Sequence, residues 1–496
     1  MIQHCPVLIV LLPLTAALLC LLFSKFNKNL GSWLVIGSIA GSLACSLQVL
    51  HQTLTSGEAI HYWMGNWEPP LGIEFVIDPL SAVMAVLITF ISLMVAVYSK
   101  PFMRKEDWLH IGGYYTLYGL LTVGRCGMVI TGDMFNLYVY LEVMSLSGYG
   151  LIAMGGKKSM LAAFRYMLIG TIGASLYLIS VAYLYAMTGT LNMADLGERI
   201  MPYLSSPPFA LAVACLFIGF GIKMALFPLH GWQPDAYNFA HPGSAAFIAG
   251  VMSKVPAYAI IRFFFYIFGV NNPIISTALT VLGILGIGGV LIGSIMALAQ
   301  YDFRRMLAYS SVAQIGYIAI GLAIGNMYGF IGAVLHIINH AFMKSALFLV
   351  IGGIQYRFGE INLYRLGGLN KKMTLSTITV TLAALSMVGI PPTAGFFSKW
   401  YLMLGAYQGG QYFYIVILVI SSLLNAVYFF RILEQMFVQH EASLTEINRH
   451  EGKLGLPPEM AIPILCAGIG ILVLGFYSVD IVDDILKSGL PEVFLR

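Results

Sequence analysis

The sequence predicts an all-α polytopic membrane protein with 14 transmembrane helices. Three observations lead to this fold class: 59% of the 496 residues are hydrophobic, only 10% are charged, and the mean hydropathy is +0.84. Soluble domains carry about 25% charged residues. The lipid bilayer is therefore the expected solvent for most of the chain.

Apolar runs long enough to cross a bilayer, about 17 to 25 residues, recur along the whole chain. In the first half they lie near residues 6 to 23, 32 to 50, 79 to 98, 110 to 131, 134 to 154, 161 to 187 and 209 to 228. In the second half they lie near residues 243 to 268, 274 to 299, 306 to 325, 327 to 351, 374 to 403, 412 to 438 and 460 to 479. Met1 to Pro6 contains no basic residue and no small-residue cleavage site follows, so the first run is expected to be a helix and not a signal peptide.

Basic residues are distributed unevenly between the loops on the two sides. With the N-terminus outside, 17 of the 26 Lys and Arg residues fall in cytoplasmic loops and helix ends, three fall on the outer side and six fall within the runs. Loops that stay in the cytoplasm carry this excess of positive charge. The asymmetry supports 14 spans with both termini on the outer face. The chain is expected in the plasma (cell inner) membrane.

Several function classes find no support in the sequence. The six cysteines are isolated and form neither a CxxC metal motif nor a disulfide framework, so no cofactor or metal site is expected from them. No strand-GxGxxG-helix or GxxxxGK[ST] pattern indicates nucleotide binding. The net charge of +4 follows from the inner loops and does not indicate nucleic-acid binding.

Five ionisable side chains lie deep within apolar runs: Lys223, Lys254, Lys344, Lys399 and Glu142. Each costs at least about 2.5 to 3.5 kcal/mol at the bilayer centre, which indicates that the function requires them there. Such groups are typical of proteins that move protons or cations. Glu142 comes about nine residues into its run, roughly 13 Å deep, close to the midplane. A structural carboxylate held by neighbouring Ser or Tyr side chains is the alternative.

Two of these lysines lie beside prolines. Pro228 follows Lys223 by five residues, and Pro391 and Pro392 precede Lys399. Proline removes a backbone donor and kinks or breaks a helix. Interrupted helices at membrane depth occur mainly where they face protein or a wet cavity. One interrupted span with a lysine in each half predicts two related half-channels.

His336, His340 and Lys344 recur every four residues in one run. Residues at this spacing share one helix face, so these three side chains form a polar stripe about 12 Å long. Histidine titrates near neutral pH, which favours a proton relay. Structural hydrogen bonding and a metal site are the alternatives, although no third ligand is adjacent and HExxH is absent.

Lys254 also lies centrally in its run, and loss of solvation there makes exchange of its proton easier. Arg262, two turns later, is expected nearer the outer end. Arg125 cannot relay a proton because its guanidinium stays charged. It is expected to form an ion pair or to act electrostatically.

Four segments carry a resemblance to a known family: "LYVYLEVMSLSGYGLI", "KMALFPLHGWQPDAYNFAHPGSAAFIAGVMSKVPAYAIIRF", "INHAFMKSALFLVIG" and "GIPPTAGFFSKW". Together they resemble the antiporter-like subunits of the complex I superfamily over nearly the whole chain. Within it, the sequence is most similar to the D-type chain of Mrp multisubunit cation/proton antiporters, because Lys399 stands where the M-type chain of complex I has glutamate. His241 departs from the pattern, since relatives usually have alanine before Pro242.

The resemblance implies two inverted five-helix repeats, spans 4 to 8 and 9 to 13, each with a broken helix. The implied divisions are residues 1–108 for the first three helices, 109–268 and 269–438 for the two repeats, and 439–496 for a loop, helix 14 and the tail. It also implies that Glu142 and Lys223 form a coupling pair and that Lys254 is the central relay. His336, His340 and Lys344 then form the bridge to Lys399, the terminal site of the second half-channel.

Three functional classes stay open. The first is a non-enzymatic subunit of an antiporter that exchanges protons for Na⁺ or K⁺. The second is a proton-pumping membrane subunit of a redox complex, such as a membrane-bound hydrogenase or a complex I-like oxidoreductase. The third is a non-redox energy-coupling partner, for example in inorganic-carbon uptake, or a scaffold. All three place the chain among other membrane subunits in a lipid bilayer, and no redox ligand is present in the chain itself.

Overall fold

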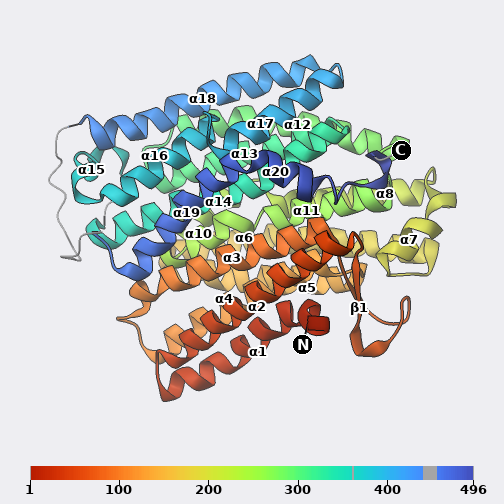
Figure 1. Cartoon of the computed structure of the whole chain (residues 1–496), viewed down its shortest axis with the longest axis horizontal. Coiled ribbons are helices and arrows are strands. Elements are labelled where there is room, and N and C mark those ends of the chain that lie inside the picture. The colour runs from red at the N-terminus through yellow and green to blue at the C-terminus, as the bar shows by residue number, and fades with distance from the viewer. Residues whose placement is uncertain (1, 360–361, 440–454, 495–496) are drawn as a thin grey trace.

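The computed structural model describes residues 2–359, 362–439 and 455–494 as a bundle of helices lying side by side (Figure 1). The first half contains η1 (Ile2–His4), α1 (Cys5–Phe26), α2 (Leu30–Ser56), β1 (Ile60–Trp63), η2 (Met64–Asn66), β2 (Glu74–Ile77), α3 (Pro79–Met103), α4 (Trp108–Ile130), α5 (Met134–Ala153), α6 (Lys157–Thr188), α7 (Met193–Arg199), η3 (Met201–Tyr203), α8 (Pro207–Met224), α9 (Gln233–Phe239), α10 (Pro242–Val251), α11 (Lys254–Ile261) and η4 (Arg262–Ile267).

The second half repeats the long helices and adds few irregular segments. It contains α12 (Pro273–Leu298), α13 (Phe303–Ala323), α14 (Met327–Phe358), η5 (Leu363–Arg365), α15 (Leu369–Lys372), α16 (Thr374–Val388), α17 (Ala394–Gln408), α18 (Tyr412–Phe437), α19 (Pro458–Phe476), α20 (Ser478–Asp480), η6 (Ile481–Leu486) and η7 (Glu492–Phe494). Arg449 and Lys453, expected in a cytoplasmic loop, and Arg496, expected outside, lie beyond the described residues.

The predicted membrane architecture is confirmed at the level of its helices. Each predicted run falls on one or two helices, and within the described ranges 11 helices are long and apolar enough to cross a membrane. Helices α4 and α5 have the length but not the hydropathy for that group, and α16 is shorter. The number 14 and the repeat boundaries therefore stay predictions. The close boundary between α4 and α5 is confirmed, because Asp133 caps α5 by accepting from the Asn136 amide at 2.6 Å.

Helix interruptions occur at both positions that the prolines predict. Helix α8 ends at Met224, the next residue Ala225 adopts a left-handed φ of 62°, and helix begins again only at Gln233. In the second half α16 ends at Val388, Gly389 has φ 93°, and α17 begins at Ala394. The run around Lys254 is also interrupted, between α10 and α11, which the sequence pattern did not predict.

The two ends of the bundle differ in charge. At one end, Arg104 pairs with Glu459 at 2.5 Å and Arg165 pairs with Asp235 at 3.1 Å, which ties together loops that carry most of the basic residues. At the other end, β1 and β2 form an antiparallel hairpin in register Ile60↔Ile77. The hairpin and α7 lie at the opposite end of the bundle from α15 (Figure 1). Which of these two ends faces the outside stays a prediction.

The core of the bundle lies around α14. This helix is buried along nearly all of its length and packs against α10, α13, α16, α17 and α19. Helices α10 and α11 are buried on every side. The broken span that carries Lys254 and the stripe-bearing α14 therefore lie in the most protected part of the protein.

Candidate functional site

Lys223 lies in the last turn of α8 and points toward α5. Its side chain is 1% exposed, and its Nζ donates to the Ser145 hydroxyl at 2.6 Å and to the Tyr149 hydroxyl at 3.4 Å. The helix can end here because the indole Nε1 of Trp232 donates to the Ile222 carbonyl at 2.9 Å, which satisfies one of the carbonyls freed by the interruption. The ammonium is thus held by two neutral hydroxyls.

Glu142 lies on the same face of α5 as those hydroxyls. Residues 142, 145 and 149 follow the i, i+3, i+7 spacing of one helix face. The side chain of Glu142 is only partly buried, and no described ion pair within 4.0 Å joins it to Lys223. The charge of Glu142 still acts on Lys223. Lys223 is therefore held by hydroxyls that lie about one helical turn along α5 from Glu142, the carboxylate that the family resemblance implies as its partner.

Lys254 is the first residue of α11, directly after the interruption in the span. It is fully buried, and its Nζ donates to the carbonyl oxygen of Ala249 at 2.6 Å, in the preceding α10. Its charge acts on His340 and Lys344 of α14. The lysine thus stabilises the broken helix end and faces the polar stripe of the second half.

The stripe on α14 is present as predicted from its spacing. His336 contacts the Ser398 hydroxyl through Nδ1 at 2.9 Å and the Gln314 Oε1 through Nε2 at 3.0 Å. The rings of His336 and His340 are nearly parallel, with centroids 5.9 Å apart. Both ring nitrogens of His340 are buried without a protein hydrogen-bond partner in the described part of the chain. Lys344 donates to the Leu307 carbonyl at 2.8 Å and to the Ser310 hydroxyl.

Lys399 lies in α17, just after the second helix interruption. Its Nζ donates to the carbonyl oxygens of Met387 and Val388 at 2.8 and 3.0 Å and to the Ser422 hydroxyl at 3.1 Å. The two carbonyls are at the C-terminal end of α16, where a positive charge is favoured. Both predicted half-channel lysines therefore lie at helix interruptions, and Lys399 holds the broken end directly.

Several residues of the site were not found from the sequence. Ser145 and Tyr149 hold Lys223, and ring contacts continue from Tyr149 to Tyr166 (4.6 Å) and from Tyr166 to Trp232 (3.8 Å). Gln314 contacts the stripe from α13. Two signals could have identified them: the i, i+3, i+7 spacing from Glu142, and a lone glutamine within an apolar run.

The three residues whose roles the sequence left open have distinct surroundings. Arg125 is fully buried on α4 and donates to the Phe247 carbonyl at 3.2 Å, with no carboxylate within 4.0 Å among the described residues. Arg262 pairs with both oxygens of Asp78 at 2.5 Å. Burial raises the pKa of Asp78, but the charge and hydrogen bonds of Arg262 outweigh burial and hold that pKa below its ordinary value of 3.8.

His241 precedes α10 and caps it. Its Nδ1 accepts a hydrogen bond from the Gly243 amide at 3.1 Å, so the proton of the neutral ring is on Nε2. Burial and then the positive charge of Arg304 lower the pKa of His241 to about 4. The ring lies edge-on to Phe102 and Tyr114, in the wall of a cavity of about 340 Å³ at the basic end.

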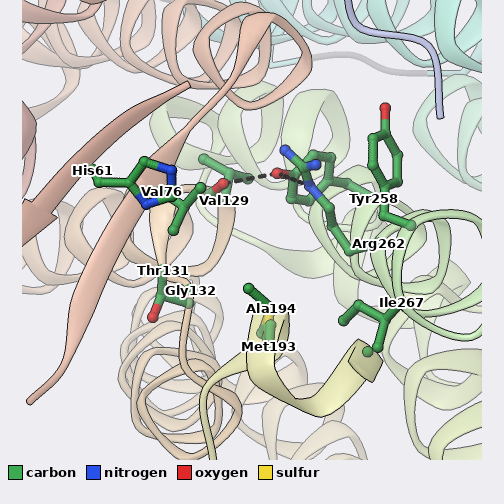
Figure 2. A pocket seen from close by; sticks show the side chains of 12 residues that line it. His61, Val76, Val129, Thr131, Gly132, Met193, Ala194, Tyr258, Arg262 and Ile267 are labelled. Carbon is green, nitrogen blue, oxygen red and sulfur yellow. Dashed lines mark hydrogen bonds between the residues drawn. The ribbon is translucent and has the colours of Figure 1, made fainter. Parts of the chain in front are cut away.

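A cavity of about 260 Å³ opens at the other end of the bundle, between the hairpin, α7 and the span that carries Lys254 (Figure 2). Tyr258 and Arg262 line it, four and eight residues after Lys254. The Tyr258 hydroxyl donates to the Val129 carbonyl at 2.8 Å and accepts a hydrogen bond from Nε of Arg262 at 2.6 Å. One helix face therefore leads from Lys254 to this cavity at the hairpin end of the bundle.

We call the seven predicted residues the row; they come from both halves and are Glu142, Lys223, Lys254, His336, His340, Lys344 and Lys399. Among them, the charge of Glu142 acts on Lys223, the charge of Lys254 acts on the three residues of the α14 stripe, and the charge of Lys399 acts on His336. Most of their ammonium groups contact backbone carbonyls or hydroxyls rather than carboxylates. No group of three or more His, Cys, Asp or Glu side chains suited to a metal occurs among residues 2–359, 362–439 and 455–494. A row of this composition can pass protons between neighbouring basic groups.

Comparison with known proteins gives consistent matches over the whole chain. Residues 131–425 match the family described as "NADH:quinone oxidoreductase/Mrp antiporter, TM", and residues 63–110 match "NADH-Ubiquinone oxidoreductase (complex I), chain 5 N-terminus". The N-type chain of NADH-quinone oxidoreductase from Desulforudis audaxviator is 45% identical over 99% of both chains. The D-type chain of an Na⁺/H⁺ antiporter from Alkalihalophilus pseudofirmus is 31% identical over 99% of this chain and 98% of its own.

A solved structure shares the fold. A chain of the membrane-bound sulfane sulfur reductase, an archaeal respiratory membrane complex, superposes with a TM-score of 0.90 at 28% identity. The match covers 99% of this chain and 98% of the other.

Proposed function

Because the chain belongs to the NADH:quinone oxidoreductase/Mrp antiporter family of multi-pass membrane proteins, we propose that it is a proton-translocating subunit of a multisubunit membrane complex. The observation that carries this proposal is the row of buried basic side chains through both halves. A lysine held by carbonyls and hydroxyls can give up its proton without leaving a carboxylate unpaired. The chain itself then performs no covalent chemistry, and any catalysis belongs to partner subunits.

Proton transfer begins at Lys223 in this proposal. Lys223 alternates between Glu142 and the Ser145–Tyr149 pair, which are one helical turn apart on α5. Pairing with the carboxylate holds the proton, whereas the hydroxyls hold the ammonium only through neutral dipoles. Making or breaking a pair of charges in a buried site changes the free energy by several kcal/mol, which is enough to gate transfer.

The proton then moves toward the centre and the second half. Lys254 receives it, and His340 and His336 with Lys344 carry it to Lys399. His340 suits the middle of this bridge because both its ring nitrogens are without protein partners in the described residues. The outer cavity beside Tyr258 and Arg262 supports an opening from Lys254 to the outer face.

Two partner reactions fit a chain of this kind. Exchange of protons for Na⁺ or K⁺ is supported by the 31% identity to the D-type chain of an Na⁺/H⁺ antiporter over nearly the whole chain. Proton pumping driven by a redox module is supported by the 45% identity to the N-type chain of an NADH-quinone oxidoreductase. It is also supported by the fold shared with a chain of a respiratory complex. In both cases the chain is expected in the plasma membrane with its termini outside.

The test uses the whole complex purified from its native membrane and reconstituted into vesicles. Proton uptake is measured with a pH-sensitive dye under an imposed Na⁺ or K⁺ gradient, for the native complex and for the Glu142→Gln and Lys223→Ala variants. Both variants are expected to assemble and to lose proton movement, and full transport in both would reject the proposal. Partner chains that bind iron–sulfur clusters or nickel favour the redox class, and small hydrophobic partners with a second large antiporter-like chain favour the antiporter.

A further inference from the structure

Arg125 is a buried charge that the proton row does not use. Its side chain is fully buried on α4, and the guanidinium lies 3.7 Å from the centroid of the Phe247 ring. Nη1 donates to the Phe247 carbonyl at 3.2 Å, while Nε and Nη2 are buried without a protein partner. A buried guanidinium with two unpaired N–H groups is unusual and requires an explanation.

The groups around Arg125 do not neutralise it. Its electrostatic neighbours are the side chains of Tyr118 on its own helix, Tyr166 on α6 and Tyr237 on α9, together with Cys126. Among the described residues no carboxylate lies within 4.0 Å of the guanidinium. Arginine keeps its proton in proteins, so this positive charge is permanent, whereas the lysines of the row can lose theirs.

Other arginines of the described chain have evident structural partners. Arg304 donates to the carbonyls of Tyr237 and Ala240, Arg357 donates to carbonyls at the basic end, and Arg262 pairs with Asp78. Each of these lies near an end of the bundle. Arg125 differs because its charge acts on Lys254 and two of its three nitrogen atoms have no protein partner among the described residues.

The neighbours of Arg125 lead toward both lysines of the first half. On one side, Lys223 contacts Tyr149, whose ring packs on Tyr166 at 4.6 Å. On the other side, the charge of Arg125 acts directly on Lys254. The hydroxyls of Tyr166 and Tyr237, which face Arg125, are also buried without a hydrogen bond of standard geometry. A route from Lys223 through Tyr149 and Tyr166 toward Lys254 therefore runs beside this guanidinium.

We infer that Arg125 is a specificity-determining residue that excludes metal cations from the segment between Lys223 and Lys254. A hydrated Na⁺ or K⁺ ion entering this segment would bring a second full charge beside an uncompensated one in a site of low dielectric constant. A proton crosses by transfer between neighbouring groups and does not need to reside there.

This inference rests on the proposed function, and its test separates the two. The background is the complex with Lys223→Ala, in which proton-coupled exchange is expected to be absent, reconstituted into vesicles. Entry of radioactive Na⁺ is then measured with and without Arg125→Gln or Arg125→Met, two neutral residues of similar length. Either neutral variant is expected to raise Na⁺ entry by about tenfold, which corresponds to removing roughly 1.4 kcal/mol from a barrier.

The matched control is Phe247→Leu in the same background. This change loosens the packing between α4 and α10 and leaves the Arg125 charge in place, so Na⁺ entry is expected to stay at the background level. Unchanged Na⁺ entry in an assembled Arg125 variant would overturn the inference, as would equal leakage in the Phe247→Leu complex. Residual proton movement in Lys223→Ala alone would count against the proposed function instead.

Discussion

The ammonium of Lys223 lies 2.6 Å from the Ser145 hydroxyl, one helical turn along α5 from Glu142. This contact places the lysine in the position away from the carboxylate. It identifies Ser145 as the group that competes with Glu142 for the charge. A single substitution at Ser145 can therefore shift Lys223 between its positions at Ser145 and at Glu142 without changing either charged residue.

We expect Ser145→Ala to slow proton movement without abolishing it. The substitution removes one hydrogen bond to a charged group, worth about 1.5 to 3 kcal/mol, and leaves only the 3.4 Å contact with Tyr149 on that side. Lys223 then stays longer with Glu142, and the rate of dye-detected proton uptake falls by about tenfold. Ser147→Ala is the control, because Ser147 donates to the Val143 carbonyl and does not contact Lys223. A rate equal to that of the control would contradict the alternating scheme.

His340→Phe and His336→Phe are expected to separate transport from stability. His340 makes no protein hydrogen bond in the described residues, so a phenyl ring should keep its packing and cost little stability while blocking transfer between the halves. His336→Phe removes contacts with Ser398 and Gln314, each worth about 1 kcal/mol, and should lower both stability and transport. Thermal unfolding of the complex in detergent and proton uptake in vesicles measure the two effects. Normal transport by the His340→Phe complex would remove this histidine from the pathway.

The sequence was sufficient for the helices and for the residue types of the row. Apolar runs located the spans, prolines located two of the interruptions, and a four-residue spacing located the stripe on α14. These features depend on local pattern, which a single sequence displays. The break before Lys254 has a similar signal in Pro256, two residues later, but this proline was not used to predict an interruption.

The contacts of the site were less predictable for two reasons. Lys254, Lys344 and Lys399 donate to backbone carbonyls, and a carbonyl is present at every residue, so residue types do not identify the partner. The partner of Arg262 is Asp78, which is 184 residues away in the chain and comes near only through the packing of α3 against this span. The family resemblance implied that Glu142 pairs with Lys223, but it could not distinguish a closed pair from a lysine held by Ser145, one helical turn away.

Asp78→Asn is expected to destabilise the complex through Arg262. Asparagine retains the N-cap of α3, where Asp78 accepts the Ser81 amide at 2.8 Å, so the change isolates the ion pair. Leaving the partly buried guanidinium unpaired should lower the free energy of unfolding by about 2 kcal/mol.

The pH dependence gives this prediction a second measurement. The pKa of Asp78 is depressed in the folded protein, so its contribution is complete above the ordinary value of 3.8 and is lost as pH falls through the depressed pKa. The difference in melting temperature between native and Asp78→Asn complexes should stay constant from pH 8 to pH 5. A difference that disappears already near pH 6 would mean that another group is responsible.

His241→Asn is expected to make the complex more resistant to acid. The pKa of His241 is lowered to about 4 by burial and by Arg304, with His110 adding to the effect, while the unfolded chain has the ordinary value of 6.5. The neutral ring therefore contributes its full stability above pH 6.5, and that stability is lost as pH falls from 6.5 toward 4. At pH 5 the loss amounts to roughly 2 kcal/mol. Asparagine does not titrate, and its side-chain oxygen can still accept the Gly243 amide.

Melting temperatures of the native and His241→Asn complexes between pH 7.5 and pH 5 measure this loss directly. The native complex should lose more stability over that interval, because only its residue 241 must take up a proton on unfolding. The other titratable groups near His241 are the same in both proteins, so the comparison isolates residue 241; they are Arg104, Lys105, His110, Tyr114, Arg304 and Tyr356. Parallel pH profiles for the two complexes would show that the imidazole is already protonated in the folded protein, and the assigned Nδ1 acceptor would then be wrong.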